Sequence, residues 1–118
     1  NAALGCAQLE NLDRYVADKR ETAACYAEFF KGKEDITFFT EPADCKSNYW
    51  LNAVVLKDKA AQLDFLEYTN DHGVMTRPVW ELMNRLPMFE HCETDGLENT
   101  EWLADRVVNI PSSVRLDK

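Results

Sequence analysis

Histidine, glycine and proline are scarce in this sequence. Its 118 residues include two His, four Gly and four Pro, so a catalytic centre built on His has little to draw on. The sequence contains no GxSxG, no HExxH and no glycine-rich phosphate loop. Its four cysteines, Cys6, Cys25, Cys45 and Cys92, form no CxxC pair. Neither a zinc site nor a redox pair is therefore indicated, and we expect free thiols and no catalytic centre.

Long apolar runs are also missing. No stretch approaches the roughly 18 uninterrupted apolar residues of a membrane helix, and no charged-then-apolar leader opens the chain. The net charge of −8 opposes nucleic-acid binding, because the 13 Lys and Arg residues are scattered along the sequence. We therefore expect a soluble protein whose partners include neither nucleic acid nor a membrane.

What is present is the composition of one globular domain. Hydrophobic residues make up 46% and charged residues 29% of the chain, and a domain of this length can form a core without disulfides. The chain begins at Asn1 rather than Met, and the helix formers Ala2, Ala3 and Leu4 follow without a capping sequence. From this start we expect a piece of a longer protein, cut upstream of Asn1.

The first half of the chain predicts one long helix and two strands. Apolar residues recur at three- and four-residue steps from residue 1 to 31, and Gly32 stands where a helix cap belongs. Such a helix would be about 45 Å long, so we expect part of it to reach another body of protein. Residues 36–40 predict a short strand, and residues 49–57 predict an interior strand covered on both faces.

The second half alternates helices with extended segments. Asp58 can cap a helix that runs to His72 and stops at Gly73, and Pro78 keeps residues 74–80 extended. The remaining segments are, in chain order, an irregular span over 82–97, a helix over 99–106 and an extended end over 107–114. This order predicts an α+β fold, a small sheet with helices packed mainly on one face.

The segment TRPVW at residues 76–80 invites a functional interpretation. Arg77 lies on a backbone that Pro78 keeps extended, close to the indole of Trp80. A guanidinium offers paired planar donors to a phosphate or to sugar hydroxyls, and an indole offers a stacking face. The alternative is a surface Arg whose stem covers a core Trp.

A second polar and aromatic cluster consists of Asn48, Tyr49, Trp50 and Asn52. We interpret it as structural, because Tyr and Trp inside a strand usually belong to the core and satisfy their polar atoms at its edge.

Four runs of residues together resemble one enzyme family. They are NAALGCAQLENLD, SNYWLNAVVL, GVMTRPVWELMNRLPMF and ENTEWLADRVVNIPSSV, at 1–13, 47–56, 73–89 and 98–114. In this order they are similar to the DegT/StrS-type aminotransferases of the aspartate-aminotransferase fold (fold type I). They look most like the branch that serves nonulosonate (legionaminic-acid-type) pathways. The resemblance covers essentially the whole chain and implies that residues 1–118 are the C-terminal small domain of such an enzyme.

The resemblance implies a bacterial cytoplasmic homodimer that uses pyridoxal 5'-phosphate. Its reaction would transfer an amino group, usually from glutamate, to a nucleotide-linked 4-keto-6-deoxy sugar. In this family the Schiff-base lysine and the other cofactor-binding motifs lie in the large N-terminal domain, and this sequence contains none of those motifs. No cofactor is therefore expected in this chain, which should be inactive without its own large domain.

Three residues correspond to substrate-binding positions of the family. Arg77 matches the Arg of the TRP motif at the rim of the active site, and Trp80 occupies the place of a bulky aromatic in the same loop. Asn84 stands where many members have a His. The resemblance implies that all three contact the nucleotide sugar, whose diphosphate would suit the charge of Arg77.

Two other hypotheses follow from the residues alone. The chain could be a self-sufficient α+β binding or regulatory module, with a cleft lined by Arg77, Trp80 and Tyr49. A thiol-based or metal-binding protein would rest only on four cysteines without useful spacing.

Overall fold

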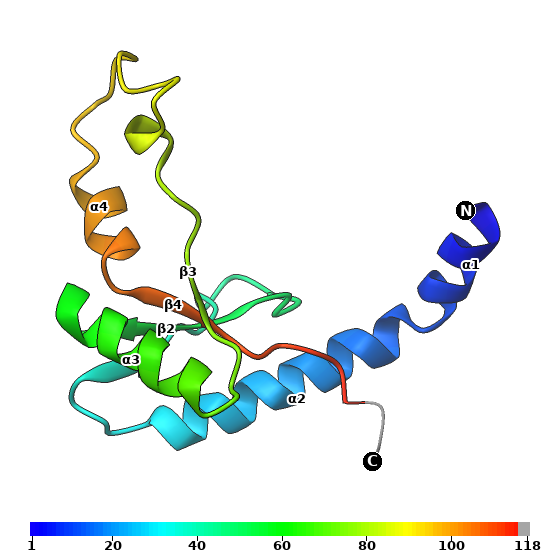
Figure 1. Cartoon of the computed structure of the whole chain (residues 1–118). Coiled ribbons are helices and arrows are strands. Elements are labelled where there is room, and N and C mark those ends of the chain that lie inside the picture. The colour runs from blue at the N-terminus through cyan, green and yellow to red at the C-terminus, as the bar shows by residue number, and fades with distance from the viewer. Residues whose placement is uncertain (116–118) are drawn as a thin grey trace.

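The computed structural model describes residues 1–115. Its elements are, in order, α1 (Ala2–Glu10), α2 (Leu12–Phe30), β1 (Ile36–Phe38), β2 (Asn52–Leu56), α3 (Lys59–Asp71), β3 (Arg77–Pro78), the 3-10 helix η1 (Met83–Arg85), α4 (Glu98–Ala104) and β4 (Val107–Ile110). The four strands form one antiparallel sheet in the order β1-β2-β4-β3. Helices α2 and α3 lie beside this sheet, and α1 projects away from it (Figure 1). The predicted α+β class is confirmed.

The hydrophobic core lies on one face of the sheet. Phe38 pairs with Val54, and Val54 pairs with Val108, so these three side chains point to the same face. All three are buried and pack with Ala23 of α2 and with the partly buried Phe65 of α3. Both helices therefore cover the same face, as the sequence predicts.

The opposite face of the sheet is only partly covered. Ala53 and Val55 of β2, which alternate with the core residues, are half-buried. On the same face Asn109 of β4 is half-buried, and Arg77 of β3, its partner in the register, is exposed. The prediction that residues 49–57 are covered on both faces is therefore wrong for the second face.

The single helix predicted over residues 1–31 is interrupted at Asn11. The backbone of Asn11 has φ −105° and ψ 0°, far from the helical values near −63° and −42°. Its Nδ2 donates to Ala7 O at 2.9 Å, and its backbone N donates to Gln8 O at 3.1 Å. This side-chain contact competes with a continuous helix, and α2 continues in a new direction (Figure 1). Gly32 then follows α2 with a φ of 75°, as predicted for a helix cap.

The strand predicted over residues 49–57 begins only at Asn52. Tyr49 has a φ of 46°, which an extended strand does not allow. Ser47 Oγ accepts from the Tyr49 N–H, and Asn48 Oδ1 accepts from the Trp50 N–H, each at 3.0 Å. These short polar side chains turn the chain before the strand starts.

Other elements are also shorter than predicted or shifted. The strands β1, β3 and β4 occupy only part of the extended segments predicted over 36–40, 74–80 and 107–114. Helix α4 spans 98–104, whereas the sequence predicts a helix over 99–106. The strands shrink because only the residues that pair with a neighbour form the ladder.

Helix α3 begins and ends where the sequence predicts. Asp58 Oδ1 accepts from the Ala61 N–H at 2.8 Å and caps the helix. His72 is the C-cap residue, and its Nδ1 lies 2.7 Å from Tyr68 O. Gly73 follows with a φ of 76°.

Gln62 joins α3 to the chain between α4 and β4. This side chain is completely buried. Its Nε2 donates to Ala104 O at 2.9 Å and to Val107 O at 2.8 Å, and its Oε1 accepts from Lys59 Nζ at 2.8 Å. The buried amide is thus fully used as a bridge between two parts of the fold.

Candidate functional site

Arg77 is presented on the partly covered face of the sheet. Its backbone belongs to β3, and on the next strand Asn109 Nδ2 donates to Pro78 O at 3.4 Å. Within residues 1–115 its guanidinium makes one hydrogen bond, from Nη2 to Met75 Sδ at 3.5 Å. Sulfur is a weak acceptor, so most of the donors of Arg77 remain available to a ligand.

A polar network fixes the backbone just before Arg77. Thr76 is buried, and its hydroxyl lies 2.6 Å from the hydroxyl of Thr69 in α3. Asn70 Nδ2 donates to Thr76 O at 3.1 Å and to Thr76 Oγ1 at 3.0 Å. Thr69 Oγ1 also lies 2.7 Å from Phe65 O, which accepts its proton, so the Thr76 hydroxyl donates to Thr69. The network attaches the start of β3 to the end of α3.

Arg77 lines a groove of about 790 Å³ that lies between α2, the turn before β2, and the strands β3 and β4. The groove is lined by Lys19, Trp50, Leu51, Met75, Arg77, Pro78, Trp80, Asn109, Ile110, Pro111, Ser112 and Ser113. Two of the predicted site residues, Arg77 and Trp80, therefore share one surface. The lining contains two cations and no carboxylate, which favours an anionic ligand.

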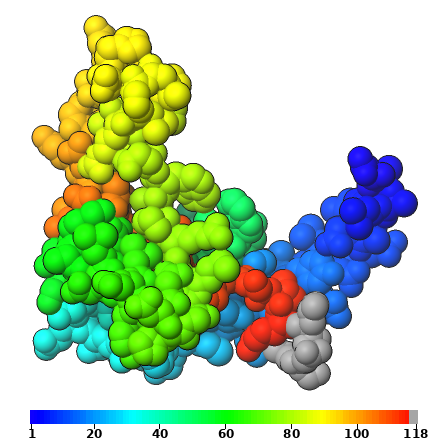
Figure 2. All heavy atoms as spheres, in the orientation of Figure 1, coloured from blue at the N-terminus to red at the C-terminus, as the bar shows by residue number. Residues whose placement is uncertain are grey.

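Asn84 lies in a different place from the other two predicted residues. It belongs to η1 and is half-buried at a second cavity of about 430 Å³, formed within residues 81–100. Residues 81–97 project from the body of the molecule (Figure 1). Between this projection and α1, the surface of the molecule is concave (Figure 2). Within this chain, Asn84 therefore does not join Arg77 and Trp80 in one site.

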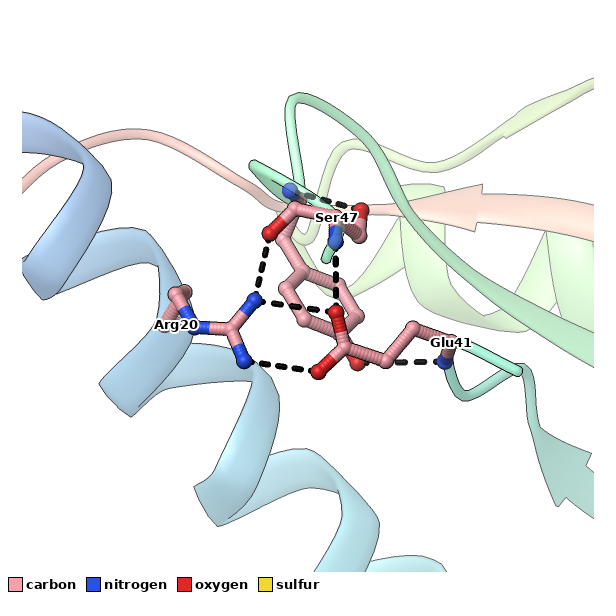
Figure 3. Close-up of polar contacts among 4 residues, drawn as sticks. Arg20, Glu41 and Ser47 are labelled. Carbon is pink, nitrogen blue, oxygen red and sulfur yellow. Dashed lines mark hydrogen bonds and ion pairs between the residues drawn. The ribbon is translucent and has the colours of Figure 1, made fainter. Parts of the chain in front are cut away.

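An ion pair connects α2 to the chain between β1 and β2. Arg20 Nη2 and Nη1 donate to the two carboxylate oxygens of Glu41 at 2.6 and 2.9 Å, and Nη1 also donates to Ser47 O at 2.5 Å (Figure 3). The Ser47 N–H donates to Glu41 Oε2 at 2.5 Å, and the Glu41 N–H donates to the hydroxyl of Tyr49 at 3.2 Å. The hydrogen bonds from Arg20 and then from Ser47 lower the pKa of Glu41 from 4.5 to about 2.

Tyr49 connects this ion pair to the core. Arg20 is also 5.6 Å from the ring centroid of Tyr49, which stacks on Phe38 of the core. The next residue, Trp50, is 65% exposed and lines the groove. The interpretation of Trp50 as a core residue is therefore wrong, because the left-handed Tyr49 turns it outward.

The C-terminal segment completes the groove along α2. Lys19 Nζ donates to Ser112 O at 2.5 Å, and the hydroxyl of Tyr26 donates to Pro111 O at 3.1 Å. Further along, the Arg115 N–H donates to Asp18 Oδ2 at 3.0 Å. Lys19 could not be predicted as a site residue, because its place in the sequence indicates only a helix position, and Ser112, its partner in space, lies 93 residues later.

We expect a distinctive pH dependence for Glu41→Gln. Because the pKa of Glu41 is lower in the folded chain, its stabilising effect is complete above about pH 4.5 and is lost as the pH falls toward about 2. The wild-type chain should therefore lose stability more steeply than the variant over this window. Urea unfolding at several pH values measures both, and a stability difference that stays constant down to pH 2 would contradict the assignment.

The described residues give no support to thiol or metal chemistry. All four cysteines are free and exposed. No group of three or more His, Cys, Asp or Glu within 1–115 is placed to hold a metal ion. Over the same residues, no helix has the length and apolar character needed to cross a membrane.

Comparisons with known proteins find one family. The model of the DegT/DnrJ/EryC1/StrS aminotransferase family matches residues 1–118. The GDP-perosamine synthase of Vibrio cholerae is 26% identical over 114 residues, which cover 94% of this chain and 31% of that protein. This chain thus spans about a third of that relative.

Two solved structures are similar over nearly all of the chain. The sugar aminotransferase CalS13 of Micromonospora echinospora is 25% identical with a TM-score of 0.81, covering 98% of this chain and 30% of that one. The aminotransferase TlmJ of Streptoalloteichus hindustanus is 22% identical with a TM-score of 0.88, covering 99% of this chain and 31% of that one. The second likeness shows the fold alone.

Proposed function

Because the chain belongs to the DegT/DnrJ/EryC1/StrS aminotransferase family, we propose that it acts in amino transfer to a nucleotide-linked 4-keto-6-deoxy sugar. The observation that carries this proposal is the groove shared by Arg77 and Trp80, which has Lys19 as a second cation and no carboxylate. Guanidinium and ammonium groups suit a diphosphate, and an indole suits a sugar or base. A nucleotide-sugar substrate also agrees with the GDP-perosamine synthase among the relatives.

We propose that residues 1–118 form the C-terminal small domain of the enzyme and pack against its large domain. The relatives are about three times as long as this chain. Helix α1 has no buried residue, and Leu4 and Leu9 are 66% and 69% exposed. Exposed apolar side chains on a helix favour contact with another body of protein. The hollow between α1 and residues 81–97 offers such a body room (Figure 2).

Within residues 1–115, the groove does not suit pyridoxal phosphate, the cofactor on which the homologues depend. Lys19, the lysine of the groove, is bonded to Ser112 O, and the groove offers no carboxylate to a pyridinium nitrogen. The proposal therefore assigns the Schiff-base lysine to the large domain, and it expects this chain to be inactive alone.

The finer assignments rest on the sequence motifs. From the family resemblance of the four runs at 1–13, 47–56, 73–89 and 98–114, we propose a nonulosonate-type pathway, a glutamate amino donor and a homodimer in the bacterial cytoplasm. A stand-alone binding module is the alternative, and the family match over residues 1–118 favours the enzyme. We also propose that Asn84, which lines the cavity within residues 81–100, contacts the substrate in the assembled enzyme.

Arg77→Ala in the enzyme that contains this chain tests the proposal. We expect KM for the nucleotide sugar to rise about 10- to 100-fold, because a hydrogen bond to a charged group is worth about 1.5–3 kcal/mol. KM for glutamate should change much less. Steady-state kinetics with each substrate varied in turn measures both effects.

The matched control is Lys33→Ala, which removes an exposed charge at the far end of α2, over the ring of Phe29. It should leave both KM values unchanged. Equal increases in the two KM values for Arg77→Ala would remove this residue from the nucleotide-sugar site.

A further inference from the structure

The side chain of Arg77 is held weakly by its own contacts. Arg77 is exposed, and within residues 1–115 the one hydrogen bond of its guanidinium goes to Met75 Sδ at 3.5 Å. An arginine side chain has several rotatable bonds, so a weak contact to sulfur leaves it many conformations. The place of the guanidinium therefore depends on how firmly the backbone of Arg77 is held.

Strand β3 holds this backbone through few residues. It consists of Arg77 and Pro78, and it lies at the edge of the sheet, where β4 is its neighbour. Pro78 restricts the backbone of Arg77 to extended conformations, but it has no N–H to donate to the ladder. Shortly after Trp80 the chain leaves the sheet in the projection of residues 81–97 (Figure 1). The position of Arg77 therefore depends on how the chain before it is attached.

Thr76 attaches the chain before Arg77 to the end of α3. Thr76 is 4% exposed, and its hydroxyl accepts from Asn70 Nδ2 at 3.0 Å and donates to Thr69 Oγ1 at 2.6 Å. Asn70 Nδ2 also donates to Thr76 O at 3.1 Å and to Leu66 O at 2.8 Å. The two carbonyl acceptors fix the orientation of the Asn70 amide, because its own oxygen could not donate to them.

We propose that Asn70 and Thr76 are positioning residues for Arg77, which set where its guanidinium meets the substrate without touching the substrate themselves. Neither of the two lines the groove, whereas Arg77 does. Thr76 and Arg77 are neighbours in an extended segment, so their side chains point to opposite sides, one toward α3 and one toward the groove. A contact residue that is held in place beforehand loses less entropy on binding. This inference rests on the proposed function and extends it to residues outside the groove.

The test is a double-mutant cycle in the enzyme that contains this chain. Asn70→Ala removes the N–H donors to Thr76, and we expect KM for the nucleotide sugar to rise about threefold to tenfold, as for one lost hydrogen bond. KM for glutamate should stay the same. In the Arg77→Ala background, Asn70→Ala should raise KM for the nucleotide sugar no further, because the side chain that it positions has been removed.

A second pair of variants isolates the hydroxyl of Thr76. Thr76→Val keeps the shape of the side chain and removes the hydroxyl, so it should raise the same KM as Asn70→Ala does. Thr76→Ser keeps the hydroxyl and should have the KM of the wild type. The matched control is Asn99→Ala, the same substitution at an exposed position of α4, which should leave both KM values unchanged.

Three results would overturn the inference while Arg77→Ala still raises KM for the nucleotide sugar. They are an unchanged KM for Asn70→Ala and Thr76→Val, an equal rise in both KM values for these variants, or a full effect of Asn70→Ala in the Arg77→Ala background. If Arg77→Ala itself has no selective effect on KM for the nucleotide sugar, the proposed function fails, and this inference fails with it. The single variant Arg77→Ala therefore distinguishes the two kinds of failure.

Discussion

Phe38→Ala is expected to lower the free energy of unfolding by about 3–5 kcal/mol, the range for a large aromatic removed from a core. Phe38 is 6% exposed in the centre of the core. Its ring lies 5.9 Å from that of Tyr26 in α2 and 6.4 Å from that of Tyr49 before β2. The substitution therefore removes contacts that join β1 to both segments, and urea unfolding measures the loss.

Phe39→Ala is the matched control for this prediction. Phe39 is the next residue in the chain, and its side chain is 58% exposed. We expect its effect to be within about 1 kcal/mol, because little apolar area is removed from a packed environment. Similar losses for the two variants would show that Phe38 is not at the centre of the core.

Gln62→Ala is expected to cost about 2–4 kcal/mol, because one buried and one partly buried carbonyl group lose their donor. Those carbonyls belong to Ala104 and Val107, at the junction of α4 and β4. Gln62→Glu should also destabilise at neutral pH, since a carboxylate has no N–H to give them. Urea unfolding of both variants checks this prediction.

Glu67→Ala is the control on the same helix, because Glu67 is exposed. We expect it to change the free energy of unfolding by less than about 0.5 kcal/mol. A Gln62→Glu chain that equals the wild type at neutral pH would show that the amide donors of Gln62 are not needed.

Local signals predicted much of the fold. The limits of α3 follow from Asp58 and Gly73, whose capping roles depend only on nearby residues. The break at Asn11 was missed because apolar spacing continues through it, while its cause is one side-chain hydrogen bond to Ala7. The start of β2 was missed for a similar reason, since Ser47 and Asn48 turn the chain within an otherwise strand-like run.

The site was predictable only in part. Arg77 and Trp80 are only three residues apart in the sequence, and both line the groove. Trp50 and Lys19 join them through the pairing of β2 with β4 and through the contact of Lys19 with Ser112, which no local pattern contains. Asn84 is close in sequence but separate in space, because residues 81–97 leave the sheet and form a cavity of their own.

The order of the strands also bears on how the chain behaves in a crowded solution. The two outer strands, β1 and β3, have three and two residues. Pro78 occupies one of the two positions in β3 and has no N–H to donate to an added strand. Short edges and an edge proline discourage pairing with strands of other molecules. The sheet is thus protected against edge-to-edge aggregation, even though its second face is partly uncovered.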